Sequence, residues 1–286
     1  MNKDLQERVT EYIQKMPSLP TSVAKVLEVC NNPQLSPADL NHVISLDPVL
    51  VGRVLKLINS AYYSLDKRVT NLVRAIIMLG INTVKNLALS STVMSQLSSK
   101  RDLKGLNMAD FWQHSLCVGV ISKLLAQKRG INSKLVEEYF TCGLLHDLGK
   151  IPLNSILSKE YLVTVKKADD LHTSLFKVEN DTLGTNHCVL GGMIVNAWKL
   201  EGVVGDVIMD HHQYAAYQGS NKDILYTVAV ADWFASAKEI GFSGNRYPEN
   251  PSYEIWGALG VNQENLIELT PAVNKEIEKA KVFLNL

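Results

Sequence analysis

Residues 45–64 read SLDPVLVGRVLKLINSAYYS, and the order of polar and apolar residues in this stretch decides the fold class. Asp47 followed by Pro48 is typical of a helix start, because aspartate caps the first turn and proline fits the first helical position. The apolar residues that follow form one broad stripe: Val49, Leu50, Val54, Leu55, Leu57 and Ile58. The stretch therefore predicts an amphipathic helix that packs against other helices.

The same signals recur on both sides of this stretch. Thr21 precedes SVAKVLEVC, and Ser36 followed by Pro37 repeats the pairing of a cap with a proline. A second apolar stripe, which Gly80 ends, consists of Leu72, Ala75, Ile76 and Leu79. The alternation of apolar and polar residues that half-buried strands need is hard to find over any useful length. The sequence therefore predicts an all-α fold.

Helix signals continue through the second half of the chain. Expected starts, most of them at capping residues, are Asn107 or Asp110, Ser133, Asn186, Gly202 and Asp223. The first of these helices is expected to run to Gly130 and the second to end near Gly149. Charge dilutes the apolar residues between 153 and 185, where a helical segment is still predicted.

The stretch SSKRDLKG at 98–105 is highly polar and lacks periodicity, which is typical of a boundary between domains. We expect an N-terminal helical bundle over residues 1–98 and a second helical domain over residues 99–286. No fixed-period repeat appears, which argues against a solenoid.

The composition narrows the classes of function. Lys plus Arg and Asp plus Glu number 29 each, so no general excess of positive charge favours nucleic acid as a partner. No apolar run approaches the roughly 20 residues that span a bilayer, and the start MNKDLQERVTEY is polar. We therefore expect a cytoplasmic protein without a membrane partner. The four cysteines are widely spaced, so they are expected to be free thiols.

Seven histidine and aspartate side chains in the second half are candidate metal ligands: His114, His146, Asp147, His187, His211, His212 and Asp232. Asp232 follows Val228 by four residues and Ala229 by three, so its carboxylate points along an apolar helix face. A buried charge there needs a partner. His211 follows Val207 by four residues, which places its imidazole on the inward side of its own helix.

Each histidine alone is more often a core or surface residue than a ligand, but the set favours a metal. Imidazole and carboxylate without thiolate pairs suit iron, manganese, zinc or nickel, whereas calcium would prefer oxygen ligands alone. Lys150 is the one cation that the sequence places near this group, so metal ions are the simplest way to offset the carboxylates. His42 and His172 lie outside the pattern and are not expected to bind.

The order of these residues resembles the HD superfamily of metal-dependent phosphohydrolases: a lone His114, the HDLGK motif at 146–150, His187, the pair at 211–212 and Asp232. The first half is similar to the N-terminal bundle of the HDOD branch, the HD-related output domain. Its matching segments are LP at 19–20, the stretch at 45–64 and VTNLVRAIIMLGINTVKNLAL at 69–89. The resemblance covers about residues 16–232.

The resemblance implies two divalent ions, with iron favoured and manganese, zinc or nickel as alternatives. His114, His146, Asp147 and Asp232 would hold one ion. The second would be held by Asp147 with His187, His211 and His212, so Asp147 would bridge the two. In an active member Asp147 would be catalytic through these ions and Lys150 would steady the charge of a phosphate. Asp110 could add a carboxylate, although capping a helix is a sufficient role for it.

The sequence departs from the related cyclic-dinucleotide phosphodiesterases, which continue the double histidine with a glutamate and a later GYP. This chain reads HHQYAAYQGS, with Gln213 in the glutamate's place, and cleavage of cyclic di-GMP is therefore disfavoured.

Two functions stay open from the sequence. The first is a bacterial signalling output module that retains its metal, has weak or no catalysis and recognises a signalling protein or a nucleotide. The second is an active phosphohydrolase that acts on a nucleotide or another phosphoester. Binding of nucleic acid by the first bundle would rest on a few basic residues that are more typical of a solvated surface.

Overall fold

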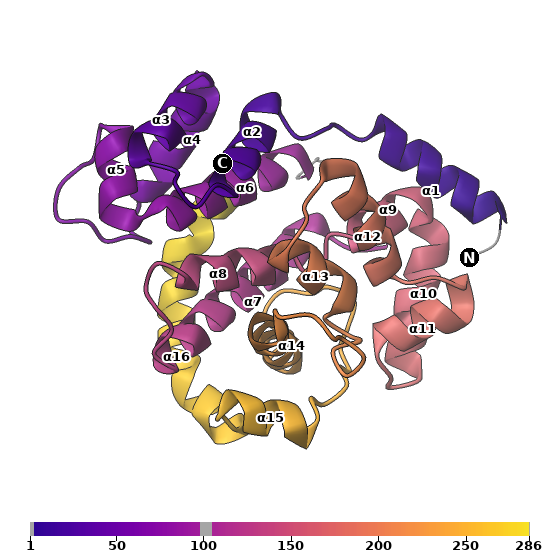
Figure 1. Ribbon diagram of the computed structural model, residues 1–286. Helices are drawn as coiled ribbons and strands as arrows, with labels where there is room; N and C mark the ends of the chain where they lie inside the picture. The colour runs from indigo at the N-terminus through magenta and orange to yellow at the C-terminus, as the bar shows by residue number, and fades with distance from the viewer. Residues whose placement is uncertain (1–2, 98–104, 286) are drawn as a thin grey trace.

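The structure is a computed structural model that describes residues 3–97 and 105–285 (Figure 1). Every regular element within those residues is helical, which confirms the all-α prediction. The first five helices are α1 (Lys3–Lys15), α2 (Thr21–Cys30), α3 (Pro37–Ser45), α4 (Pro48–Ile58) and α5 (Leu72–Leu79). They are followed by α6 (Ile81–Leu97) and, after the undescribed stretch, by the long α7 (Met108–Lys128).

The remaining helices are short except for two. They are α8 (Val136–Leu145), α9 (Lys150–Ile156), α10 (Ser158–Asp170), α11 (Leu175–Leu183), α12 (His187–Trp198) and α13 (Val203–Asp210). The longer α14 (Lys222–Ala237) and α16 (Gln263–Ala280) are separated by α15 (Tyr253–Leu259), and a 3₁₀ turn (Lys281–Asn285) follows α16.

Helix starts in the first half follow the capping signals of the sequence. Asp47 Oδ1 accepts hydrogen bonds from the backbone N–H groups of Val49 and Leu50, and Pro48 occupies the first turn of α4. Ser36 and Asp39 form a reciprocal capping box at the start of α3. These side chains satisfy donors that an isolated helix end leaves unpaired. The two predicted starts are confirmed.

Two helix ends in the second half refine the predictions. Asn107, not Asp110, caps α7, because its Oδ1 accepts hydrogen bonds from Ala109 and Asp110. The helix expected to end near Gly149 stops at Leu145 instead, and a new helix starts at Lys150. Most of residues 153–185 is helical, in α9, α10 and α11, as predicted.

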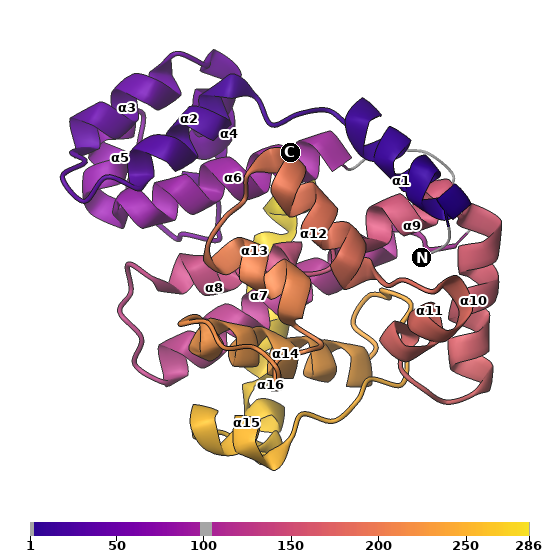
Figure 2. The same ribbon diagram turned by 45° about the vertical axis from the view of Figure 1, so that its right-hand side comes forward.

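The bundle formed by α2–α6 lies on one side of the molecule, while α1 lies apart from it against α9 and α12 (Figures 1 and 2). The predicted division near Ser98 lies outside the described residues. One continuous cluster of buried apolar side chains includes residues from both sides of that point. The organisation into two domains stays a prediction.

The centre of the second half is the packing of α7 against α8 and α14. Glycines let α7 and α8 approach closely: a Cβ atom at Gly143 would lie 2.8 Å from the Cα of Gly119. This contact fixes the end of α8, which carries the histidine and aspartate of the HDLGK motif.

The described cysteines are free thiols, as expected, and all but Cys30 are fully buried. No single helix among the described residues is long and apolar enough to cross a membrane. The pair α5 and α6 meets that criterion only when taken together, and it bends by 115°.

Candidate metal centre

The seven predicted ligands come from five helices and meet in the interior. His114 lies within α7, and His146 and Asp147 follow the last residue of α8. His187 is the first residue of α12, His211 and His212 follow α13, and Asp232 lies within α14. All are buried except His212, which is half-buried.

One half of the cluster is rich in carboxylate. Asp232 Oδ1 lies 2.9 Å from His114 Nε2 and 3.7 Å from His146 Nε2. On its other side His146 Nε2 lies 3.2 Å from Asp147 Oδ2. These atoms come from three helices, and they converge on one small space. We call these four residues the carboxylate half.

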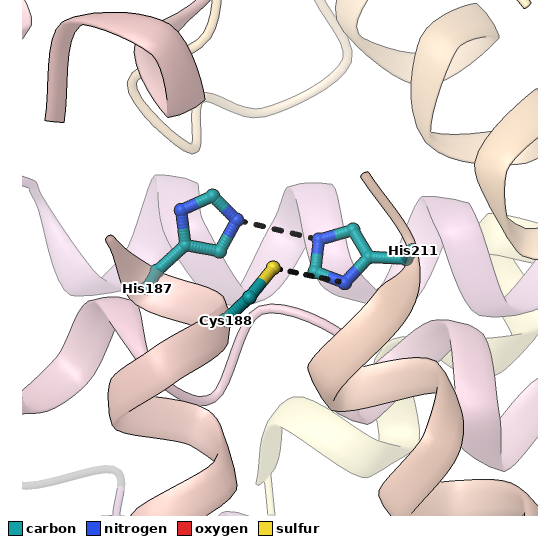
Figure 3. A group of neighbouring side chains, drawn as sticks. All are labelled: His187, Cys188 and His211. Atoms are coloured by element: carbon teal, nitrogen blue, oxygen red, sulfur yellow. Dashed lines mark hydrogen bonds between the residues drawn. The ribbon is translucent and has the colours of Figure 1, made fainter. Parts of the chain in front are cut away.

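The other half is rich in imidazole. The Nε2 atoms of His187 and His211 lie 3.3 Å apart, as Figure 3 shows. Asp147 Oδ1 is 3.4 Å from the first of these nitrogens and 3.6 Å from the second. The His212 ring lies 5.0 Å from the His187 ring and 4.4 Å from the His211 ring, measured between centroids. We call Asp147 with these three histidines the imidazole half.

The two oxygens of Asp147 therefore face different halves: Oδ2 faces His146, and Oδ1 faces His187 and His211. The rings of His146 and His211 are also in contact, with centroids 5.0 Å apart. This carboxylate therefore lies between the two halves and joins them.

Three imidazoles are oriented through their Nδ1 atoms. His146 Nδ1 lies 2.7 Å from the carbonyl oxygen of Gly143, and His211 Nδ1 lies 2.9 Å from that of Val207. His187 Nδ1 lies 2.6 Å from Glu179 Oε2. A carbonyl or carboxylate partner places the proton on Nδ1, which leaves the lone pair of Nε2 free for a metal.

Glu179 is a functional residue that the sequence reasoning missed. It is fully buried and accepts hydrogen bonds from the backbone N–H of His187 and from the hydroxyl of Tyr161. Burial opposes ionisation of its carboxyl group, but the neighbouring His187 and Lys150 hold its pKa below the usual value. Its position four residues after the buried Leu175 places Glu179 on the inward face of α11. The other charged residues of this segment make that pattern hard to recognise in the sequence.

Gly149 has a steric role beyond ending a helix. A Cβ atom at this position would lie 1.7 Å from the carbonyl oxygen of His187 and 2.5 Å from the nitrogen of Gly191. The backbone after Asp147 therefore lies directly against the first turn of α12. This approach brings Asp147 within reach of His187, and a side chain at position 149 would separate them.

The carboxylate half favours charged groups. Burial opposes a charge on His146, but Asp147 and Asp232 outweigh it and raise the pKa of His146 to about 10. Burial also opposes ionisation of Asp147, whose pKa is nevertheless held well below its usual value by His146 and Lys150. The pKa of Asp232 is likewise low, because the hydrogen bond that it accepts from His114 and the nearby His146 ring outweigh its burial. Both carboxylates are therefore ionised at neutral pH.

The imidazole half favours neutral groups. Burial lowers the pKa of His211 to about 4, and Asp147 only partly opposes this shift. Burial and the neighbouring His211 and His187 hold the pKa of His212 well below its usual value. Neutral imidazoles are the form that binds a metal.

Lys150 lies beside the bridging carboxylate. Its Nζ donates a hydrogen bond of 2.7 Å to Asp147 Oδ2 and one of 3.3 Å to Ser243 Oγ. Burial opposes the charge of this lysine, but Asp147 outweighs burial and raises the pKa. Ser243 belongs to the loop after α14, which is held on α7 by the hydrogen bond from Phe242 N to the carbonyl oxygen of Asp110.

The donor atoms fit a divalent metal. His146 Nε2 and Asp147 Oδ1 are buried, and neither has a hydrogen-bond partner among the described residues. A buried polar atom without a partner is unfavourable unless something else satisfies it. Three groups of described residues have ligand atoms close enough together to hold an ion: His114, His146 and Asp232; His146, Asp147 and His211; and His187, Cys188 and His211. His146 belongs to two of these groups, and His212, at the edge of the cluster, belongs to none.

Cys188 also lies near His211, but on the wrong side of the ring. Its Sγ is 3.8 Å from His211 Nδ1, the nitrogen that donates to the carbonyl oxygen of Val207 (Figure 3). His187 faces the opposite nitrogen. Burial also raises the pKa of the Cys188 thiol, which disfavours the thiolate. We therefore leave Cys188 out of the ligand set.

The histidines outside the predicted set lie elsewhere. His42 is in α3 of the first bundle, and the ring of His172 packs against Tyr247 at 4.5 Å between centroids. Asp110 lies in the first turn of α7, one turn before His114.

Comparison with known proteins identifies the family. The HDOD domain matches residues 16–214. An uncharacterized protein of Treponema pallidum is 25% identical over 224 residues, which are 78% of this chain, and the chain spans only 43% of that relative.

Solved structures share the fold over nearly the whole chain. An HDOD domain protein of Geobacter sulfurreducens is 24% identical with a TM-score of 0.76, and the match covers 98% of this chain and 99% of that one. A candidate phosphohydrolase of Shewanella amazonensis is 23% identical with a TM-score of 0.70, over 97% and 98% of the two chains. A candidate signal transduction protein of Marinobacter aquaeolei is 20% identical with a TM-score of 0.71, over 97% of this chain and 64% of that one. The fold and the match over residues 16–214 give one conclusion: this chain belongs to the HDOD family.

Proposed function

We propose that this protein is a signal-transduction output module that holds two divalent ions in its core and has weak or no catalytic activity. The observation that carries the proposal is that two buried atoms, His146 Nε2 and Asp147 Oδ1, have no hydrogen-bond partner among the described residues and lie within a converging set of ligands. The Marinobacter protein with the same fold is a candidate signal transduction protein, which agrees with this role.

The ligand assignment follows the two halves. His114, His146, Asp147 and Asp232 would hold one ion, and Asp147 would share the second with His187, His211 and His212. Iron is favoured, with manganese, zinc or nickel as alternatives, because the donors are imidazole and carboxylate. When bound, the ions would supply positive charge to two buried carboxylates and act as Lewis acids towards an oxygen ligand.

Limited access supports weak catalysis. His146 and Asp147 are each only 1% exposed. The opening that His211, His212 and Asp232 line has a volume of about 20 Å³. That space is sufficient for about one water molecule. A phosphoester would need the surrounding segments to move before it could reach the centre.

An active phosphohydrolase is the second candidate, and Lys150 is the observation in its favour. Its ammonium group lies 2.7 Å from Asp147 Oδ2, where it could steady the charge of a phosphate. A pocket of about 300 Å³ that includes His114, Ser243 and Arg246 lies beside the centre. Two Shewanella proteins with this fold are candidate phosphohydrolases, one of them named as metal-dependent.

The two candidates differ in turnover by the metal-loaded protein. The experiment measures metal content by elemental analysis, followed by hydrolysis of p-nitrophenyl phosphate, its bis ester and a panel of nucleotides. The output module is expected to be fully loaded and to release product at far less than about 1 s⁻¹, or not at all. Turnover by the native chain at about 1 s⁻¹ or faster, which Asp147→Ala abolishes, would establish the enzyme instead. A chain that takes up no metal would refute both candidates.

A further inference from the structure

A groove of about 570 Å³ lies between the first bundle and the helices that carry the candidate ligands. Its walls are α2 and α6 on one side and α8 with the turn from α12 to α13 on the other. Ligand pockets for small molecules have volumes of about 300–1,000 Å³. The groove is separate from the metal centre and shares none of its residues.

The start of α13 opens onto this groove. Gly202 is its N-cap residue and offers no side-chain acceptor, and Val203 and Val204 line the groove. The backbone N–H of Asp206 donates to the carbonyl oxygen of Gly202. The N–H groups before it in this turn have no acceptor within the described chain. Free N–H groups at a helix start, together with the helix dipole, favour an anion.

Charges of both signs surround the groove. Lys25, Lys85 and Lys199 line it with Glu28, Glu138 and Glu201. Lys25 pairs with Glu28, and Lys85 pairs with Glu138 at 3.4 Å. Lys199, beside the start of α13, has no ion pair within the described residues, and it holds a left-handed backbone conformation with a φ of 53°. Equal numbers of cations and carboxylates suit a ligand that combines one anionic group with hydrogen-bond donors.

Asn86 supplies an independent sign of a missing ligand group. Its side chain lines the groove and is 1% exposed. The amide Nδ2 donates to the carbonyl oxygen of Asn82 at 2.9 Å, but Oδ1 has no partner among the described residues. A buried acceptor without a donor is unfavourable. An N–H or O–H group of a ligand would relieve it.

We propose that this groove binds a nucleoside monophosphate, with its phosphate at the start of α13 beside Lys199 and a donor group of the base towards Asn86. The site rests on the proposed signalling function, for which it supplies the recognised molecule. Glu138 lies eight residues before His146 in the chain, and Val204 lies seven before His211. A ligand in the groove therefore contacts both α8 and α13, the helices that end at the metal ligands.

The test is isothermal titration calorimetry on the metal-loaded full chain with AMP and with GMP. Adenosine, guanosine and inorganic phosphate are the comparison ligands. We expect one of the two nucleotides to bind at least tenfold more tightly than its nucleoside, because a charged phosphate contributes more than about 1.4 kcal/mol. Phosphate alone is expected to bind more weakly than that nucleotide.

Two variants locate the site. Lys199→Gly removes the ammonium group and relieves the left-handed conformation, so affinity should fall about tenfold while the melting temperature is unchanged or higher. Asn86→Leu removes the unpaired acceptor and should weaken the nucleotide but not inorganic phosphate. The matched control is Lys177→Ala, an exposed lysine of α11 away from the groove, which should leave affinity unchanged.

The proposal is overturned if neither nucleotide binds at millimolar concentration to metal-loaded protein, or if both groove variants bind as the native chain does. Equal affinity for a nucleotide and its nucleoside would also overturn it. Metal content is measured on the same samples. Nucleotide binding without metal would refute the proposed function alone, and full metal without nucleotide binding would refute the groove alone.

Discussion

The two halves of the metal centre share one carboxylate but have opposite electrostatics. In the carboxylate half, Asp147 and Asp232 raise the pKa of His146 to about 10 despite its burial. In the imidazole half, burial lowers the pKa of His211 to about 4. The neighbouring His146 and His187 lower it as well, and Asp147 only partly opposes them. The same residue type at the same depth therefore takes opposite charge states.

The difference in charge indicates what a metal ion would contribute to each half. The carboxylate half has an excess of negative charge that a proton on His146 partly offsets. In the imidazole half, the Nδ1 protons of His187 and His211 are directed to Glu179 and Val207, so the Nε2 lone pairs of the two rings face each other at 3.3 Å. A divalent ion would replace the proton in the first half and satisfy the lone pairs in the second. Asp147, with one oxygen directed to each half, couples the two.

The largest effect is expected from Asp147→Ala, which removes the carboxylate that both halves share. It leaves the buried Lys150 ammonium without its carboxylate partner, so the free energy of unfolding should fall by about 3–5 kcal/mol. Both ions should be lost. Urea unfolding and elemental analysis measure these effects, with the exposed Asp170→Ala as control. Retention of two ions would show that the halves are not joined through Asp147.

The free energy of unfolding of the protein, after a chelator has removed its metal, should depend on pH differently for the two halves. The pKa of His211 is about 4 in the folded state against 6.5 in the unfolded state, so its stabilisation is present above pH 6.5 and is lost as the pH falls towards 4. The pKa of His146 is about 10, so its stabilisation is present below pH 6.5 and is lost as the pH rises towards 10.

The contribution amounts to about 3 kcal/mol for His211 and about 5 kcal/mol for His146 across the two windows. Urea unfolding at several pH values measures them. His146→Gln should flatten the alkaline side of the profile and leave the acid side in place. The assignment is wrong if His146→Gln changes only the acid side.

A smaller effect, confined to one half, is expected from Asp232→Leu. The substituted side chain suits the apolar face of α14, but His114 Nε2 loses its partner at 2.9 Å. The free energy of unfolding should fall by about 1–3 kcal/mol, with one ion retained in the imidazole half. The matched variant His211→Leu should retain the ion of the carboxylate half. Titration of the chelated variants with Mn²⁺ counts the sites, and two intact sites in Asp232→Leu would remove Asp232 from the ligand set.

The smallest effect is expected from Glu179→Gln, which acts on the imidazole half through the orientation of His187. A neutral amide still accepts a hydrogen bond but polarises the imidazole less, so metal affinity should fall about 10–100-fold. Competition with a chelator of known affinity measures this change. Tyr161→Phe removes only the hydrogen bond that Tyr161 donates to Glu179 and should have less effect. Equal effects of the two variants would argue for loss of packing.

The sequence predicted the local features of the fold better than the contacts between distant segments. Caps such as Ser36 and Asp47 act on their own helix within a few residues, so their role is visible in the sequence. The inward position of Asp232 follows from helical spacing alone. The boundary between α8 and α9 was missed because Gly149 meets His187 only in the folded chain.

The sequence predicted the candidate ligands by residue type. It missed residues whose role depends on a contact with a distant segment of the chain. Glu179 lies in a helix with many charges, and only its contact with His187 distinguishes it from the others. The groove beside Asn86 combines segments from both halves of the sequence, so no local pattern indicates it. The orientation of His146 and His211 depends on backbone carbonyl groups, which the identity of a residue does not encode.

Anomalous X-ray diffraction from crystals of the metal-loaded protein, measured above and below the iron and manganese edges, tests the central claim most directly. We expect two anomalous peaks, one among His114, His146, Asp147 and Asp232 and one among Asp147, His187, His211 and His212. Crystals of Asp147→Ala should show neither peak. A structure of fully loaded protein with its metal elsewhere, or with no anomalous peak within reach of Asp147, would contradict the account.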